Sequence, residues 1–326
     1  MAVEGLELEP SKAYTNQLQE CFGDDIMERI AAGVRQIPLP HCSAPGETLP
    51  VLRLDPAEPR YERPVLVIPG FTAGVVAKLP FAAEMAHRGF DTLLPGQNRS
   101  GILRDPTNKR SATYSQAMNY LALLGHTETE GPVDFVTHSY GSLIFQAMHR
   151  LANERQRSYF TDSKVVMLAP AGSNDHEWFG SLAGRFLVNT ITEARTAKDM
   201  PDPGDMARAG AKNFMANMPR TIREMWELTR LRMDYPVLTA SELGVIVVAA
   251  FAEDRLYPDR VMESTMTVAI EAGVRYATPI SLQPTADNKI RSGKHASHND
   301  EQFNPERPVG LIEDVLRFTD RWRVPA

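Results

Sequence analysis

The chain has 326 residues, of which 43% are hydrophobic and 23% charged, a composition typical of a globular protein with one large α/β domain or two smaller ones. The formal net charge is −6 and lysine and arginine form no run, which argues against nucleic acid as a partner. No stretch of about 18 apolar residues occurs, so the sequence predicts no membrane span, and residues 1–10 lack the apolar segment of a secretion signal.

Residues 1–35 are predicted to form a helical leader. Apolar residues recur at helical spacing between positions 11 and 35, with Gly23 as the expected break. Two short strands follow at Gln36–Leu39 and Leu49–Leu54, joined by a turn rich in Pro, Gly and Ser. We expect them to form an antiparallel hairpin at a sheet edge. The leader could pack on the sheet, cover a pocket or mediate contacts in a homodimer.

Strand and helix signals alternate over the next part of the chain. Apolar runs predict buried strands at Pro64–Ile68, Phe90–Leu94, the beginning of Val133–Gly141, and Lys164–Leu168. Helical patterns separate them at Val76–Gly89, Ser115–His126 and Ser142–Arg150. This alternation predicts a parallel sheet with helices on both faces and the carboxyl ends of the strands on one edge.

Strand signals stop at Ser173. From there to Glu242 the amphipathic segments 179–196, 205–218 and 220–233 predict helices, among which methionines and aromatic residues gather. We predict a helical cap inserted at residues 173–242. Its methionine-rich stripe could be an ordinary helix core or a pliable apolar pocket for a substrate, and both can hold.

The sheet is expected to resume at Gly244–Phe251, with a last strand near Ala277–Leu282. Helices are predicted from about Asp259 to Ala272 and from Pro305 to Arg321. Together, residues 36–172 and 243–326 predict an α/β core with a mostly parallel sheet of about eight strands.

The stretch Val133–Gly141 predicts a strand that enters a small-residue turn and then a helix. A serine at such a turn, Ser139, would project over the sheet edge toward the free N–H groups of the helix N-terminus. Gly141 would allow close backbone packing. Thr137 stands where the usual Gly-x-Ser-x-Gly pattern has its first glycine, which suggests a slightly looser contact between turn and helix.

A serine hydroxyl needs a base to take its proton and an acid to orient that base. Asp254 follows an apolar strand and would lie on the same edge as Ser139, although a helix cap or a plain loop carboxylate is the alternative. Glu253 is the neighbouring alternative, but its side chain should point away from that of Asp254. Two histidines lie in the polar loop 283–300. We favour His298, which Asn-Asp follows shortly before the final helix, over His295, and either could be a solvated loop histidine.

Two backbone N–H groups could stabilise the oxyanion of a tetrahedral intermediate. Tyr140 follows the serine at the helix N-terminus and can supply one of them. Phe71, in the Pro69-Gly70-Phe71 loop after an earlier strand, can supply the other, because Gly70 permits a close approach.

These residues, in the chain order oxyanion loop, Ser, acid, His, resemble the α/β-hydrolase superfamily. The resemblance covers about residues 36–322. It includes Pro69-Gly70-Phe71 in place of the family's His-Gly-x, and the Pro95–Gly101 loop in place of its Asp-x-x-Gly-x-Gly. It implies the α/β-hydrolase fold with a helical cap, a Ser139–His298–Asp254 triad, and an oxyanion hole at Phe71 and Tyr140.

The resemblance implies a serine hydrolase that cleaves an ester or thioester through an acyl-enzyme, with amide and carbon–carbon cleavage left open. Epoxide hydrolases and haloalkane dehalogenases of this fold use an aspartate at the position of Ser139, so those reactions are disfavoured. Two alternatives remain: an acyltransferase of the same fold, and a non-catalytic protein that keeps the ligand pocket. The expected partner is a small acyl substrate with an apolar portion.

No cofactor or metal is expected. The histidines are scattered and do not make a zinc site, and residues 69–74 lack the GxGxxG spacing of a dinucleotide site. Cys21 and Cys42 have no metal-type spacing and are expected to be free thiols. Free thiols are usual in a reducing compartment, so we expect the protein in the cytoplasm.

Overall fold

The computed structural model describes residues 12–38, 48–71, 75–96, 103–104, 110–127, 131–172, 180–182, 184–185, 218–249, 259–274, 276–277 and 305–318. The predicted helices 179–196 and 205–218 lie almost wholly outside these ranges, as does most of the strand predicted near Ala277–Leu282.

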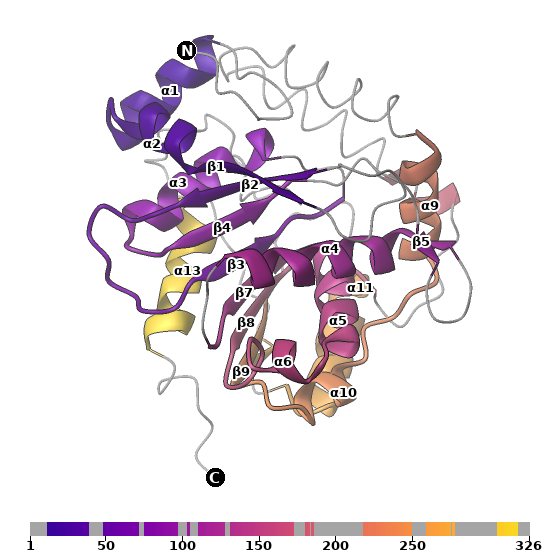
Figure 1. The fold of residues 1–326 in the computed structure, drawn as a ribbon. Helices are drawn as coiled ribbons and strands as arrows, with labels where there is room; N and C mark the ends of the chain where they lie inside the picture. Colours follow the sequence, from indigo (N-terminus) through magenta and orange to yellow (C-terminus); the bar gives the residue numbers. More distant parts are fainter. Residues whose placement is uncertain are drawn as a thin grey trace.

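An eight-stranded sheet forms the centre of the molecule (Figure 1), in the order β1-β2-β4-β3-β7-β8-β9-β10. The strands are β1 Val34–Pro38, β2 Thr48–Leu54, β3 Val65–Ile68, β4 Thr92–Pro95, β7 Asp134–His138, β8 Lys164–Leu168, β9 Val245–Ala249 and β10 Tyr276–Ala277. β2 pairs antiparallel with both β1 and β4, and all other neighbours are parallel. The predicted mostly parallel sheet and its antiparallel edge hairpin are confirmed. A separate two-stranded ladder, β5 Leu103–Arg104 and β6 Arg110–Ser111, was not predicted.

Helices cover both faces of this sheet. They are α1 Lys12–Phe22, α2 Ile26–Gly33, the 3₁₀ turn η1 Val76–Lys78, α3 Leu79–His87, α4 Ala112–His126, α5 Gly141–Leu151, α6 Glu154–Arg157, α9 Met218–Leu228, α10 Tyr235–Thr239, α11 Asp259–Glu271 and α13 Glu306–Arg317. In the view of Figure 1, α4 and α5 lie in front of the sheet and α13 lies behind it.

Two hydrophobic cores result, one on each face, because side chains alternate along each strand. In β3, Leu66 and Ile68 join the core under α4 and α5, whereas Val65 and Val67 join the core under α1, α2, α3 and α13. The leader breaks at Gly23, which has a φ of 98°. Its helices belong to the second core, so the described part of the leader packs on the sheet.

The helices α9 and α10 lie in the segment predicted as a cap. α9 ends at Leu228, earlier than the predicted helix 220–233, and the segment that follows hydrogen-bonds to α5. The Gln146 side chain donates to the carbonyl of Arg232 (2.8 Å) and accepts from the N–H of Asp234 (2.5 Å). These bonds fix the segment after α9 against the helix that follows Ser139. The division into a core and a cap stays a prediction.

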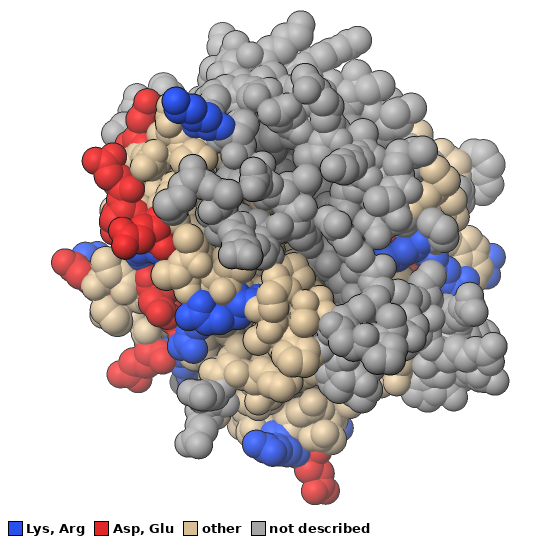
Figure 2. Space-filling view, turned by 45° about the horizontal axis from the view of Figure 1, so that its top comes forward, with Lys and Arg blue, Asp and Glu red and all other residues tan. Residues whose placement is uncertain are grey.

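The described surface carries charge of both signs. On the face shown in Figure 2, Asp and Glu side chains gather along one flank, whereas Lys and Arg occur in several separate groups. None of the helices within the described ranges combines the length and the apolar character needed to cross a bilayer.

Candidate active site

Ser139 lies between the end of β7 and the start of α5, and its φ is 50°. A side chain with a Cβ adopts this left-handed backbone rarely, at a cost of about 1–3 kcal/mol. Three backbone hydrogen bonds hold it there. The N–H of Ser139 donates to the Leu168 carbonyl (2.9 Å), and its carbonyl accepts from the N–H groups of Ser142 and Ala171 (3.1 Å each). The predicted strand–turn–helix is therefore present, with a strained residue at its centre.

Two glycines let backbone segments approach Ser139. A Cβ on Gly141 would lie 2.3 Å from the carbonyl oxygen of Ile68, so the first turn of α5 packs directly on the end of β3. A Cβ on Gly70 would lie 2.7 Å from Nδ1 of His138 and 3.2 Å from Cβ of Ser139. The clash at Gly141 is with backbone, so a Cβ is not tolerated there, whereas a Cβ on Gly70 would force the His138 ring to move.

Thr137 strengthens the contact between strand and helix. Its hydroxyl lies 2.8 Å from that of Ser142, and both residues are fully buried. A hydroxyl pair buried in this way contributes about 1 kcal/mol. The Thr137 side chain thus makes a hydrogen bond of its own to α5, and Gly141 permits the close approach of α5 to β3. The looser contact suggested by the absent first glycine stays a prediction.

Phe71 and Tyr140, the predicted oxyanion-hole residues, lie together beside Ser139. Their rings meet edge to face, with centroids 6.4 Å apart and an interplanar angle of 87°. Tyr140 precedes the first residue of α5, and no residue in the described ranges accepts a hydrogen bond from its backbone N–H. A free N–H at a helix N-terminus is a donor available to a ligand.

The predicted acid and base, Asp254 and His298, lie outside the described residues, and so does the alternative base His295. The triad therefore stays a prediction. Across the ranges that the structure describes, no side chain hydrogen-bonds to the Ser139 hydroxyl.

A buried lysine lies near the serine and was missed by the sequence analysis. Lys78 is fully buried, and its Nζ lies 3.5 Å from Nδ1 of His138, the residue before Ser139. A Cβ on Gly70 would also strike the His138 ring, so Lys78 and His138 lie next to the predicted oxyanion loop. The sequence did hold one sign of this burial, because Lys78 stands between the apolar residues Ala77 and Leu79 at the end of η1.

The side chain of Tyr140 enters a buried polar network that the sequence analysis also missed. Its hydroxyl lies 2.7 Å from Oγ1 of Thr113, which in turn bonds to the carboxylate of Glu227. Burial raises the pKa of the Tyr140 phenol well above its usual value, and the carboxylates of Glu224 and Glu227 raise it further. The phenol therefore stays protonated and can donate.

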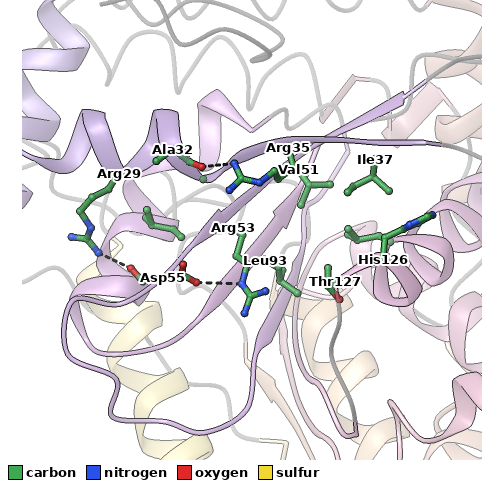
Figure 3. Close-up of a pocket in the computed structure, with 13 residues that line it drawn as sticks. Arg29, Ala32, Arg35, Ile37, Val51, Arg53, Asp55, Leu93, His126 and Thr127 are labelled. Atoms are coloured by element: carbon green, nitrogen blue, oxygen red, sulfur yellow. Dashed lines mark hydrogen bonds and ion pairs between the residues drawn. The ribbon is translucent and has the colours of Figure 1, made fainter.

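A groove of about 520 Å³ lies elsewhere, between α2, β1, β2 and the end of α4 (Figure 3). Three arginines line it, and each is bound to protein oxygens: Arg29 donates to the carbonyl of Asp55 (2.7 Å), Arg53 pairs with the Asp55 carboxylate (3.2 Å), and Arg35 donates to the carbonyl of Ala32. The Arg29 bond joins α2 to the segment that follows β2, whereas the other two bonds are local. Of the predicted site residues that the structure describes (Ser139, Tyr140 and Phe71), none lines the groove.

The described residues contain no cluster of three or more His, Cys, Asp or Glu side chains that could hold a metal ion. That statement covers neither His295 nor His298, which lie outside the described ranges.

No protein-family model and no curated protein matches the chain. Solved structures do. A putative lipase from Acinetobacter baumannii AYE matches with a TM-score of 0.62 at 12% identity, covering 97% of this chain and 99% of that one. A membrane phospholipase A, described as a bacterial virulence factor, matches with a TM-score of 0.60 at 14% identity, covering 96% and 94%. The 2-hydroxy-6-oxo-6-phenylhexa-2,4-dienoate hydrolase of Rhodococcus sp. strain RHA1 matches with a TM-score of 0.58 at 14% identity, covering 87% and 98%.

At these identities the matches establish architecture and leave chemistry open. The chain has the α/β-hydrolase fold, as the order of its sequence motifs predicts.

Proposed function

We propose that the protein is a serine hydrolase that cleaves an ester or thioester bond, with Ser139 as the nucleophile. The observation that carries the proposal is the left-handed backbone of Ser139 at the junction of β7 and α5. A strained serine at this point of an α/β sheet presents its hydroxyl above the strand ends, where a substrate can reach it.

The proposed reaction has two halves. Oγ of Ser139 attacks the acyl carbon, and its proton passes to His298, which Asp254 orients. The tetrahedral intermediate collapses, the bond to the alcohol or thiol breaks, and His298 returns the proton to that leaving group. Water then attacks the acyl-enzyme by the same steps, giving the carboxylic acid and free Ser139.

The oxyanion of each intermediate would be bound by the backbone N–H groups of Phe71 and Tyr140. Two observations support this assignment: no residue in the described ranges accepts a hydrogen bond from the Tyr140 N–H, and a Cβ built on Gly70 would lie 3.2 Å from Cβ of Ser139. Each such donor contributes roughly 3 kcal/mol to the transition state, because it is oriented before the charge develops.

We propose that the protein acts in the cytoplasm on a small acyl substrate with an apolar portion. The names of two matched structures, a putative lipase and a phospholipase A, support an ester of that kind. The methionine-rich segment predicted within residues 173–242 would suit a pliable acyl pocket.

Turnover of p-nitrophenyl esters and acyl-coenzyme A thioesters, from acetyl to palmitoyl, tests the proposal. The wild-type chain should hydrolyse at least one series, Ser139→Ala should not, and the neighbouring control Ser142→Ala should retain hydrolysis. Equal rates for wild type and Ser139→Ala, or no turnover by folded wild type, would contradict it.

A further inference from the structure

We infer that Glu227 is a positioning residue for the oxyanion hole, acting through a hydrogen-bond chain that runs from Glu227 to Thr113 to Tyr140. The inference rests on the proposed function, because it concerns the amide of Tyr140 as an oxyanion donor. It assigns a role to helix α9 that the sequence motifs do not indicate.

Glu227 is buried on α9 and directs its carboxylate at the N-terminus of α4. It accepts hydrogen bonds from the backbone N–H groups of Ala112 and Thr113 (2.9 Å each) and from the Thr113 hydroxyl (2.6 Å). Its exposed fraction is only 4%. The free N–H groups and the dipole of a helix N-terminus favour a buried anion at this place, and Arg223 donates to the other side of the carboxylate (3.1 Å).

The direction of the chain follows from the chemistry of its members. The Thr113 hydroxyl donates its proton to a carboxylate oxygen of Glu227 (2.6 Å). The lone pairs of that hydroxyl are then left for Tyr140, whose phenol lies 2.7 Å away and donates. The Tyr140 phenol also lies 3.5 Å from the same Glu227 carboxylate, so Glu227 holds the phenol both through Thr113 and by a longer direct contact.

The chain holds the residue whose backbone serves the proposed reaction. Tyr140 directly follows Ser139, and its exposed fraction is 2%. Its ring lies edge-on to Phe71, and its hydroxyl is tied to α4, so the side chain is held at both its middle and its tip. An oxyanion donor works because it is oriented in advance, and an error of about 1 Å in such a group can cost about 100-fold in rate.

The inference makes the docked position of α9 part of the active-site geometry. α9 contacts α4 through Glu227, and α4 contacts the residue after Ser139 through Thr113. Substrate entry by displacement of α9 would break this chain. We therefore place α9 among the parts that stay in position during turnover.

Two substitutions test the chain with little change in shape. Tyr140→Phe keeps the ring against Phe71 and removes only the hydroxyl. Glu227→Gln keeps the size of the side chain but sets an amide nitrogen against N–H and O–H donors. Each should lower kcat about 10-fold, less than the 100-fold or more for loss of a whole oxyanion donor, and should leave KM within about twofold.

Affinity for a trifluoromethyl ketone provides a second readout. This inhibitor forms a tetrahedral adduct with a serine and places an oxyanion in the hole. Its Ki should rise by the same factor as kcat/KM falls, since both depend on the oxyanion. The double variant Tyr140→Phe/Glu227→Gln should lose little more than Glu227→Gln alone, because the two changes interrupt one chain.

Glu224→Gln is the matched control. Glu224 lies one turn earlier on α9, is equally buried, and bonds to Arg220 within its own helix (2.8 Å). It should lower the melting temperature as Glu227→Gln does while leaving kcat and the inhibitor Ki near their wild-type values.

The outcomes separate the two proposals. Wild-type kcat and Ki in folded Tyr140→Phe would overturn the positioning role and leave the hydrolase function standing. A kcat loss in Glu224→Gln as large as that in Glu227→Gln would also overturn it, because α9 stability alone would explain both. A wild-type chain that neither hydrolyses esters nor binds the inhibitor would remove the proposed function itself.

Discussion

The two ends of strand β7 differ in how their polar groups are satisfied. At its start, Asp134 is fully buried and accepts hydrogen bonds from the N–H of Lys164 (2.6 Å) and from the Tyr61 hydroxyl. Arg63 lies 3.7 Å away. Burial raises the pKa of the Asp134 carboxyl, and these donors counteract the rise.

At the other end of β7 the arrangement is reversed. Ser139 has a strained backbone, and within the described part of the chain neither its hydroxyl nor the N–H of Tyr140 has a hydrogen-bond partner. Among the described residues, one strand thus has an end whose polar groups are satisfied within the fold, and an end where the proposed nucleophile Ser139 and the proposed oxyanion donor Tyr140 have no hydrogen-bond partner. The comparison predicts that substitutions at the two ends separate stability from activity.

The largest effect should come from Ser139→Ala. Hydrolysis should fall by at least about 10⁴-fold, because the proposed nucleophile is lost, while the free energy of unfolding stays within about 0.5 kcal/mol of wild type. Ester turnover and urea unfolding measure the two quantities. A loss of stability that parallels the loss of activity would contradict the separation.

Asp134→Ala should show the opposite pattern. It leaves the Lys164 N–H and the Tyr61 hydroxyl without their acceptor, which should cost about 3 kcal/mol of unfolding free energy. In urea unfolding, the control Asp162→Asn, which weakens an exposed ion pair with Arg63, should cost less than about 1 kcal/mol. The kcat of folded Asp134→Ala should match wild type, and a large fall in kcat would show that the two ends are not independent.

Ser139→Gly should stabilise the protein while abolishing activity. Glycine adopts a φ of 50° without a Cβ penalty, so the unfolding free energy should rise by about 1 kcal/mol. Ala169→Gly is the control, because Ala169 also has a positive φ, of 43°. This substitution should likewise raise the unfolding free energy, but it leaves Ser139 in place and should retain activity. Thermal unfolding of both variants checks this, and destabilisation of Ser139→Gly would show that the backbone there is not strained.

The smallest effect concerns His149, which has a buried nitrogen without a hydrogen-bond partner among the described residues. His149 packs edge-on against Phe160, and its Nδ1 is buried without a partner among the described residues. Burial, followed by the charges of Arg157 and Arg150, lowers the pKa of His149 below its usual 6.5. The unfolded chain therefore binds this proton more readily, so stability should fall as the pH drops through 6.5.

This contribution to stability cannot exceed about 1.4 kcal/mol per pH unit, because one proton is involved. Urea midpoints measured between about pH 5.5 and 7.5 should show it in wild type and not in His149→Phe. An identical pH dependence in both proteins would exclude His149 as the cause.

Features set by neighbouring residues could be predicted from the sequence. The turn at Ser139 is encoded within one strand, one serine and the helix that follows, and Gly141 marks where that helix packs on β3. Apolar runs likewise predicted β8 at its observed bounds, because a strand covered on both faces has no polar alternation to blur its ends.

Features that depend on distant partners could not be predicted. Helix α4 begins at Ala112, earlier than the predicted Ser115, with Ser111 as its cap. A capping box would place Glu or Gln at position 114, where the sequence has tyrosine. The carboxylate comes instead from Glu227, which is 115 residues from Ala112 in the chain, and no local pattern reveals such a contact.

Reaction with a fluorophosphonate probe, followed by mass spectrometry of the labelled peptide, tests the central claim most directly. The folded wild-type chain should gain one covalent adduct, located at Ser139, and Ser139→Ala should gain none. Tyr140→Phe should react at the same residue but more slowly, because the phosphonyl oxyanion occupies the same hole. An unlabelled wild-type protein, or an adduct that persists in Ser139→Ala, would contradict the assignment of Ser139 as the nucleophile.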